Sequence, residues 1–370
     1  MKVALVHDWL TGMRGGEKVL EALCLLFPQA DLFTLVHQRG SVSPTIESHR
    51  VTTSFVQRLP LATTQYRRYL PLFPTAIEQF NLDGYDLVIS SSHCAAKSVV
   101  VPGRAWHICY CHSPMRYAWD QFDEYFGPAR VGRMASRWVY RPLLARLARW
   151  DAATASRVHR FVANSAYVAG RIRRYYDRES VVVYPPVDTD FFRPSASGPG
   201  DHLLVVSALV PYKRVDRAID ACALAGMPLR IVGDGPDRTR LERRAGAGVT
   251  FLGHQTDEAV REEYQQARAT ILAGEEDFGM VPVEAQACGR PAIALARGGA
   301  LETVTDGDTG LLFDEPTPAS LAAAIRRLDN QTFSAVRIRD HAEAFSRQRH
   351  IDALKAIVDA TVAQAPGTRW

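Results

Sequence analysis

The sequence predicts an α/β protein in which two parallel sheets follow one another along the chain. Short apolar runs alternate with amphipathic helical patterns, and this alternation begins again after residue 200. A Pro/Gly/Ser-rich stretch at residues 193–200 separates the two series. The 370 residues suffice for two to three domains of ordinary size. We therefore expect two Rossmann-like domains.

The first series predicts a domain that covers residues 1–186. Its expected strands are 2–7, 31–36, 86–90, 107–110, 159–163 and 181–184, and its expected helices are 16–27, 130–157 and 165–175. Pro185-Pro186-Val187-Asp188 follows as a rigid connector, because proline fixes its own backbone and restricts the residue before it.

The second series predicts a domain that covers residues 187–344. Its expected strands are 203–207, 229–232, 249–252, 270–272, 292–294 and 310–313, and its expected helices are 213–225, 236–246, 257–267, 281–288 and 299–305. The last helical stretch, residues 333–363, lies outside this repeat. We expect its end, a helix over about 345–370, to cross back and pack on the first domain.

The net charge of +4 conceals an asymmetry between the halves. Residues 1–186 carry 23 Lys and Arg against 14 Asp and Glu, and the excess concentrates in residues 130–178, which hold twelve arginines. Trp138, Tyr140 and Trp150 lie among them. Arginine with interleaved aromatics suits an anionic membrane surface. A solvated, arginine-rich helix face is the alternative, and nucleic acid is not expected because no recognition motif accompanies the charge.

The sequence has no apolar run long enough to span a membrane, and its first residues lack the apolar core and cleavage site of a signal peptide. We therefore expect a cytoplasmic protein, peripheral on the cytosolic face of the inner membrane. The six cysteines are scattered through apolar segments without metal-site spacing, which indicates buried reduced thiols.

The strongest local motif runs from Glu276 to Gly289. A strand ends near Ala273, an acidic loop with a glycine follows, and a helix is expected from about Val281, with Pro282 and Glu284 in its first turn. A helix start offers free N–H groups and a positive dipole end to a diphosphate. The carboxylate of Glu284 can accept two hydrogen bonds from a ribose diol, while Glu276 can reach a sugar hydroxyl. The alternative is a buried amphipathic helix with two incidental acids.

This motif, Glu-x7-Glu before Ala-x-Ala-x-Gly with Phe-Gly inside it, resembles the donor site of glycosyltransferase family 4. Further segments agree in order and spacing along nearly the whole chain: Asn164-Ser165, Pro185-Pro186-Val187-Asp188, Pro211-Tyr212-Lys213-Arg214, Val232-Gly233-Asp234-Gly235-Pro236 and Phe251-Leu252-Gly253. The resemblance implies the GT-B fold, with two Rossmann-like domains facing a central cleft, and a retaining transfer from a nucleotide sugar.

Segments 89–94, 107–120 and 212–216 resemble the mannosyltransferase-like subgroup that builds bacterial O-antigen and exopolysaccharide. That resemblance implies mannose transfer from GDP-mannose to a lipid-linked or saccharide acceptor, with UDP-, ADP- or dTDP-sugars as other possible donors. Two alternatives remain open: a nucleotide-sugar 2-epimerase of the same architecture, and a sugar-nucleotide-binding protein without activity.

The resemblance assigns roles to individual residues. It places His112 beside the transferred sugar, donating to a sugar hydroxyl or contacting the reaction centre through its backbone, and it gives Lys213 and Glu276 the other catalytic positions. The expected donor-binding residues are Gly15, Gly16, Asn164, Arg214, Gly233, Gly235, Gln255, Phe278, Gly279, Met280, Val281 and Glu284. Asp8 is a candidate acceptor contact, and the other histidines, such as His7 and His93, are expected to be structural.

One position departs from the family pattern, because many relatives have an arginine where this chain has Ala208. The charge of the leaving diphosphate would then fall on Lys213 and Arg214, unless Arg214 pairs with Asp216. Positioning and electrostatic stabilisation suffice for a transfer in which the diphosphate itself deprotonates the acceptor. Asp188-Thr189-Asp190 and Asp306-Gly307-Asp308 have the form of a metal-binding motif but belong to a connector and a turn, so we expect no cofactor and no metal ion.

Overall fold

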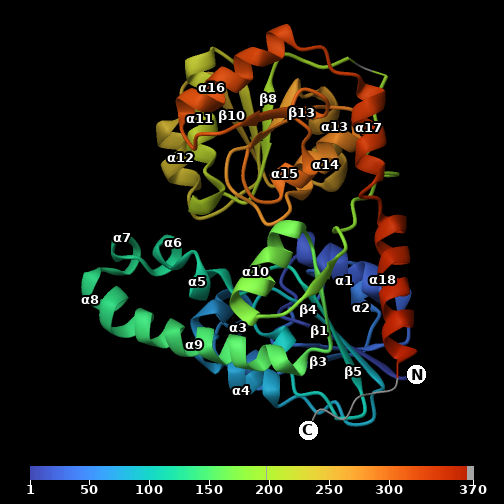
Figure 1. Ribbon diagram of the computed structural model, residues 1–370. Coiled ribbons are helices and arrows are strands. Elements are labelled where there is room, and N and C mark those ends of the chain that lie inside the picture. Colours follow the sequence, from blue (N-terminus) through green and yellow to red (C-terminus); the bar gives the residue numbers. More distant parts are fainter. Residues whose placement is uncertain (197, 365–370) are drawn as a thin grey trace. The chain divides into compact units, whose positions relative to one another are not determined.

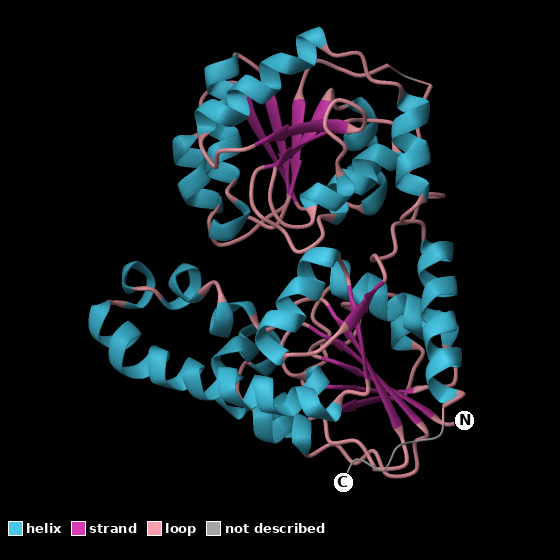
Figure 2. Ribbon diagram, viewed as in Figure 1, coloured by secondary structure: helices cyan, strands magenta, loops and turns pink. Residues whose placement is uncertain are grey.

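The computed structural model contains two compact units, each built on one parallel sheet (Figure 1). The structure describes residues 1–196 and 198–364. The first unit contains Met1–Pro186 together with the residues from His350 onward, and the second contains Val187–Arg349. In each unit, helices flank the strands of the sheet (Figure 2).

The sheet of the first unit has seven strands in the order β3-β2-β1-β4-β5-β6-β7, and every neighbouring pair is parallel. The central strands β1 and β4 are buried along their whole length, although His7 and Ser90–Ser92 make their carboxyl ends polar. The strands are β1 (Val3–His7), β2 (Asp31–Thr34), β3 (Val51–Thr53), β4 (Leu87–Ser92), β5 (Trp106–Cys111), β6 (Arg160–Ala163) and β7 (Ser180–Val182).

Helices of very different length connect these strands. The α-helices are α1 (Gly15–Leu26), α2 (Pro44–Glu47), α3 (Ala62–Gln65), α4 (Phe73–Glu78), α5 (Arg116–Trp119), α6 (Phe122–Phe126), α7 (Pro128–Val131), α8 (Arg133–Ala135), α9 (Arg141–Thr154), α10 (Ala166–Tyr176) and α18 (Arg347–Val362). Shorter turns are η1 (Phe55–Arg58), η2 (Tyr66–Leu72), η3 (Ala96–Ser98), η4 (Ser136–Tyr140) and η5 (Ala155–Arg157).

The predicted single helix over 130–157 is wrong. Gly132 has φ +84°, a conformation that favours glycine, and it ends α7. The chain then forms α8 and the π-helical turn η4 before α9 begins. Together α6 to α9 form an arm that extends from the rest of the first unit (Figure 1).

The sheet of the second unit has six strands in the order β10-β9-β8-β11-β12-β13, again all parallel. They are β8 (Leu203–Val206), β9 (Leu229–Val232), β10 (Val249–Gly253), β11 (Ala269–Leu272), β12 (Ala292–Leu295) and β13 (Gly310–Phe313). The helices are η6 (Pro211–Lys213), α11 (Val215–Ala225), α12 (Arg238–Arg244), α13 (Asp257–Gln266), α14 (Met280–Ala287), α15 (Ala300–Thr303), α16 (Pro318–Arg327), η7 (Leu328–Asn330) and α17 (Ala335–Glu343).

Helix α18 belongs to the first unit, although it follows the whole second unit in sequence. Its Leu354 and Val358 lie in the same buried cluster as Leu5 of β1, and α18 lies beside α1 in Figure 1. The helix begins two residues later than predicted, at Arg347. Residues 365–370 of the predicted helix lie outside the described residues. Within the described ranges, each helix is too short or too polar to cross a bilayer.

The sequence did not predict β3, α16 or the short helices α2 to α6. Strand β3 is only three residues long, and α16 was not predicted although Thr317 caps it and Pro318 stands at its start. The interpretation of the six cysteines as buried thiols is confirmed, because all six are free and buried.

We predict that Leu354→Ala will destabilise the first unit, because Leu354 is 3% exposed and fills its core. Truncation of a buried leucine to alanine costs about 2–5 kcal/mol. Urea unfolding followed by fluorescence would measure the change. The exposed neighbour Lys355 supplies the control, and an equal loss in Lys355→Ala would contradict a core role for this helix face.

Candidate active site

The first candidate site lies where β1, β4 and β5 end, and these strands are neighbours in the sheet. His7 ends β1, Ser91 lies near the end of β4, and His112 follows β5. Parallel strands present their carboxyl ends at one edge, so the three side chains meet. Nδ1 of His7 lies 3.1 Å from the Ser91 hydroxyl, and that hydroxyl lies 2.8 Å from Nε2 of His112.

The start of α1 closes over this group. Gly16 lies against both histidine rings, because a Cβ at that position would be 3.7 Å from Nε2 of His112 and from Cε1 of His7. Asn164 donates from its side-chain amide to the carbonyl of His112 at 3.0 Å. The structure thus brings together the predicted residues Gly16, Asn164 and His112, and Gly15 is the first residue of the same helix.

Asp8 does not offer a free carboxylate to an acceptor. It is fully buried, and its two oxygens accept hydrogen bonds from the backbone N–H groups of four successive residues, 93–96, at 2.6–3.0 Å. These four donors engage both carboxylate oxygens within the loop itself. Asp8 therefore fixes the loop after β4, and the expectation of an acceptor contact is wrong.

Three histidines gather here rather than one. The ring of His93 lies 6.2 Å from that of His112 and 6.1 Å from that of His7. Burial, followed by the neighbouring His93 and His7, lowers the pKa of His112 well below its usual range, so His112 is a neutral imidazole. Sequence reasoning treated His7 and His93 as structural. His7 ends β1 and His93 follows β4, the strand between β1 and β5, and these positions were the available signal.

The second candidate site lies at the point where the strand order of the second sheet reverses, between β8 and β11. The connections that follow these two strands run over opposite faces of the sheet. A crevice therefore opens at the carboxyl ends of the two strands, and this is the usual ligand site of such sheets. Lys213 follows β8 and Glu276 follows β11. Their side chains form an ion pair, with Glu276 buried and Lys213 partly exposed.

Glycines allow the loops at this crevice to lie directly against each other. A Cβ on Gly233 would meet the carbonyl oxygen of Ser207 at 1.9 Å, and one on Gly274 would meet that of Tyr212 at 2.6 Å. Gly235 contacts Leu209 in the same way. The predicted glycines 233 and 235 therefore hold the loop that leads to Lys213 by close packing of backbone against backbone.

A further glycine pair, Gly298-Gly299, holds the other side of the crevice and was missed in the sequence. Gly298 has φ +62°, and a Cβ there would lie 2.3 Å from the carbonyl oxygen of Glu276. The N–H of Gly299 donates to that same oxygen at 2.9 Å. The loop that follows β12 therefore fixes the backbone of Glu276. The two adjacent glycines were the signal in the sequence that could have indicated this close contact.

Helix α14 begins at Met280, one residue earlier than predicted, with Gly279 at its N-cap and φ +86°. Glu284 consequently lies beyond the first turn, and its predicted placement within that turn is wrong. Its Oε2 accepts a hydrogen bond from the buried Tyr264 hydroxyl at 2.9 Å. The backbone N–H groups of Met280 and Val281 stand in the first turn, where no intrahelical acceptor reaches them.

Arg214 pairs with Asp216, as the sequence allowed. Its Nε and Nη2 lie 3.1 and 3.2 Å from the two carboxylate oxygens, and its own backbone has φ +53°. Burial opposes ionisation of Asp216, but the hydrogen bond and charge of Arg214 outweigh it and lower the pKa of that carboxyl. Nearby, the buried Arg217, missed in the sequence, donates to the carbonyl of Ala273 at the end of β11.

Two predicted donor contacts use their side chains within the protein. The ring of Phe278 is buried and lies 5.6 Å from that of Phe345, so this side chain packs within the protein. The side-chain amide of Gln255 donates to the carbonyl of Leu252 at 2.6 Å, which braces the loop after β10.

The two Asp-x-Asp segments have arginine partners. Asp188 lies 2.5 Å from Arg347, and Asp306 lies 3.0 Å from Arg327. Among the residues that the structure describes, no group of three or more His, Cys, Asp or Glu side chains is arranged to hold a metal ion.

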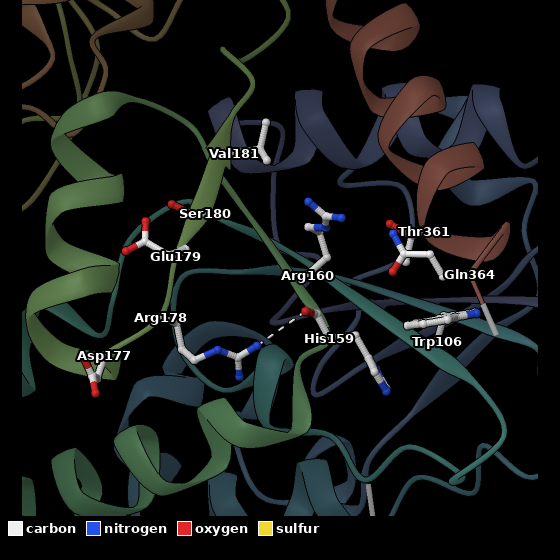
Figure 3. A pocket seen from close by; sticks show the side chains of 10 residues that line it. All are labelled: Trp106, His159, Arg160, Asp177, Arg178, Glu179, Ser180, Val181, Thr361 and Gln364. Carbon is white, nitrogen blue, oxygen red and sulfur yellow. Dashed lines mark hydrogen bonds between the residues drawn. The ribbon is translucent and has the colours of Figure 1, made fainter. Parts of the chain in front are cut away.

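A cavity of about 600 Å³ lies in the first unit, and none of the first candidate site's residues lines it (Figure 3). Trp106, Arg160 and Ser180, the first residues of β5, β6 and β7, line it. Arg178 at its wall donates to the carbonyls of Ala155 and Val158. Ligands of open parallel sheets bind at the carboxyl ends of strands, whereas this cavity is at the amino ends, so we do not regard it as the active site.

Comparisons with known proteins agree with this arrangement. A family model described as Glycosyltransferase Family 4 matches residues 13–191, and one described as Glycosyl transferases group 1 matches residues 187–345. A crystal structure of Anabaena HepE in complex with UDP and glucose superimposes with a TM-score of 0.74 at 19% identity, covering 97% of this chain and 100% of that one.

The strand orders of the two parallel sheets, together with these matches, assign the chain to the GT-B class of α/β proteins. The two family models together match residues 13–345, both describe glycosyltransferases, and the one that matches residues 13–191 describes family 4. A D-inositol 3-phosphate glycosyltransferase of Geodermatophilus obscurus is 34% identical over 240 residues, which cover 55% of this chain and 53% of that protein. An exopolysaccharide phosphotransferase of Streptomyces coelicolor is 40% identical over 150 residues, 37% of this chain and 16% of its own. The chain thus spans about half the length of the first of these relatives.

We predict that Gly233→Ala will lower the free energy of unfolding of the second unit, because the added Cβ would clash with a backbone oxygen and φ is +126°. A change that forces backbone to move in this way costs about 3 kcal/mol or more. Thermal unfolding of the full chain would measure it. Gly246→Ala is the matched control, since a Cβ there meets nothing within 4 Å; comparable losses in both variants would refute the close-packing account.

Proposed function

We propose that this protein is a retaining glycosyltransferase that moves a hexose from a nucleotide sugar to an acceptor hydroxyl. The observation that carries the proposal is the Lys213–Glu276 pair at the reversal point of the second sheet, ahead of the first turn of α14. A cation, a helix start and a carboxylate in one crevice suit a diphosphate joined to a sugar.

The proposed reaction forms a bond between the acceptor oxygen and C1 of the sugar, on the face from which the diphosphate leaves. The C1–O bond to the diphosphate breaks, its electron pair stays with the diphosphate, and the acceptor proton passes to a diphosphate oxygen. Lys213 and the N–H groups at Met280 and Val281 stabilise the developing negative charge. Arg214 contributes less than the sequence predicts, because Asp216 already neutralises it.

The carboxylates recognise hydroxyl groups in this proposal. Glu276 releases Lys213 to the diphosphate and accepts from a hydroxyl of the transferred sugar. Glu284 accepts from the ribose diol with its backbone held by α14 and one oxygen oriented by Tyr264. In the first unit, His112 contacts the transferred sugar, with Gly15, Gly16 and Asn164 forming its surroundings.

GDP-mannose remains our favoured donor, on the resemblance of segments 89–94, 107–120 and 212–216 to mannosyltransferases. UDP-sugars are the main competitor, since the structure of Anabaena HepE has also been determined with UDP-glucose. We propose a lipid-linked saccharide of cell-surface polysaccharide synthesis as acceptor. The relatives named for D-inositol 3-phosphate instead favour a small phosphorylated acceptor, so both belong in the assay.

A donor screen tests these assignments. Full-length protein is incubated with GDP-mannose and with UDP-, ADP- and dTDP-hexoses, each with and without a polyprenyl-diphosphate saccharide or inositol 3-phosphate. Transfer with release of the nucleoside diphosphate, and with retained anomeric configuration by NMR, supports the proposal. Formation of a 2-epimer, or binding without turnover of any donor, would overturn it. Activity is expected to persist in EDTA, because the protein supplies the charge that a metal would.

We predict that Lys213→Ala will lower kcat about 100- to 1,000-fold, because removal of one donor to the developing charge costs that much. Lys213→Arg should keep part of the activity, since it keeps the charge but not the geometry. Steady-state kinetics with the donor found above would measure both. The exposed Arg243 on α12 provides the control, and a similar fall in Arg243→Ala would mean that general charge, not Lys213, matters.

We also propose that the arm formed by α6 to α9 rests on an anionic membrane surface. Met134, Trp138 and Val139 are 72%, 64% and 57% exposed near its end, which is unusual for large apolar side chains. Exposed arginines at 130, 133, 137 and 141 surround them. Apolar side chains among guanidinium groups suit the headgroup layer of acidic lipids.

Vesicle flotation tests the arm. The protein should float with phosphatidylglycerol vesicles and remain free of phosphatidylcholine vesicles, because the arginines need anionic lipid. Trp138→Ser should weaken flotation several-fold, and raised salt should weaken it further. Leu25→Ser alters an apolar side chain that is 48% exposed in the same unit but outside the arm. Equal weakening by both substitutions would contradict docking through the arm.

A further inference from the structure

We propose that Glu17, His7 and Ser91 form a chain that positions His112 with its proton on Nε2 and leaves Nδ1 as an acceptor for a substrate hydroxyl. The chain is hydrogen-bonded from His7 through Ser91 to His112, and the carboxylate of Glu17 faces its inner end at a distance longer than a hydrogen bond. All four residues of this chain of side chains lie in the first unit, so its existence does not depend on the proposed function. Its consequence for substrate does rest on the proposed function, in which His112 contacts the transferred sugar.

The four side chains lie in sequence through the interior of the first unit. Oε1 of Glu17 is 3.6 Å from Nε2 of His7, Nδ1 of His7 is 3.1 Å from the Ser91 hydroxyl, and that hydroxyl is 2.8 Å from Nε2 of His112. Glu17, His7 and Ser91 are all buried, and only His112 reaches the surface. The line therefore runs from the interior to the edge of the sheet where the candidate site lies.

The direction of the hydrogen bonds follows from what each group can donate. Burial raises the pKa of Glu17, but His7, His93 and a backbone hydrogen bond together outweigh burial and lower the pKa overall, so this carboxyl is an anion that only accepts. The hydrogen of His7 consequently lies on Nε2, which faces Glu17. In a neutral His7 with its hydrogen on Nε2, Nδ1 is a bare acceptor.

The same reasoning continues to His112. Nδ1 of His7 must receive the single hydrogen of the Ser91 hydroxyl, which leaves that oxygen as the acceptor for its other neighbour. Nε2 of His112 therefore carries the hydrogen that Ser91 accepts. Because His112 is neutral, its Nδ1 has a free lone pair. The side chain of His112 would thus accept from a sugar hydroxyl, in contrast to the donor role that the family resemblance offered.

The surroundings hold this arrangement in place. The N–H of Arg14 donates to the second oxygen of Glu17 at 3.1 Å, which fixes the carboxylate at the start of α1. Gly16 packs beside the rings of His7 and His112, and a Cβ added there would be at ordinary contact distance from both. The other titratable or charged groups that face His112 are His93, His350 and Arg116, and each disfavours a positive charge on the His112 ring. Asp8 is occupied by backbone donors and lies on the His93 side.

Nitrogen NMR of the full-length protein, labelled with ¹⁵N-histidine, tests the proton positions without any substrate. Protonated and bare ring nitrogens differ strongly in ¹⁵N shift, and the His112→Gln spectrum identifies the His112 signals by their loss. The expected result is the Nε2–H tautomer of neutral His112. The Nδ1–H tautomer, or an imidazolium, in the wild-type protein would overturn the proposal.

Substitutions at Ser91 test whether the chain causes that state. Ser91→Ala should give His112 a mixture of tautomers and lower kcat about tenfold at unchanged donor KM, the size expected for one hydrogen bond. Ser91→Thr keeps the hydroxyl and should restore both. Ser90→Ala is the matched control, because Ser90 makes a similar bond, 2.9 Å, to His107 on the other face of β4.

The outcomes separate this inference from the proposed function. If no donor is turned over but the tautomer of His112 responds to Ser91→Ala and not to Ser90→Ala, the hydrogen-bond chain stands and the transferase assignment fails. If transfer is found and Ser91→Ala changes neither the tautomer nor kcat, the chain has no positioning role and the proposal is wrong.

Discussion

The geometry of the second unit depends on the close approach of backbone to backbone around its reversal point. Lys213 and Glu276 come from loops after two neighbouring strands, and their pairing needs those loops to lie in contact. Glycines at 233, 274 and 298 permit that contact, because any side chain there would occupy the space of a carbonyl oxygen. The ion pair is thus the result of a backbone arrangement that few residue types allow.

The two units carry different kinds of polar group at the ends of their strands. In the second, cations and carboxylates stand at the strand ends and their backbones are locked by glycine. In the first, the strand ends carry neutral or fully satisfied polar groups: a buried aspartate with four backbone donors, and a serine between two histidines. The first unit therefore supplies directed hydrogen bonds, whereas the second supplies charge.

Much of the fold could be read from the sequence, because strong apolar runs bounded by turn residues mark their own limits. Strand β13 was predicted at its observed residues, and β9 likewise. Weak periodicity hid β3, and a single glycine with positive φ, Gly132, broke a helix that its apolar pattern predicted as continuous. At the sites, residues in a linear motif, such as Glu276 and Lys213, were found. Ser91, His7 and Arg217 were not, since their importance arises only when distant strands become neighbours.

The connection of the units has a consequence for how the chain acquires its structure during synthesis. The first unit needs Leu354 and Val358 of α18 to complete a core that begins at β1, yet the ribosome makes them after the entire second unit. The second unit is continuous in sequence and can become compact while the first still exposes apolar surface. The apolar residues of the first unit must therefore avoid aggregation until α18 has been synthesised. The first unit is begun earlier than the second but completes its fold later.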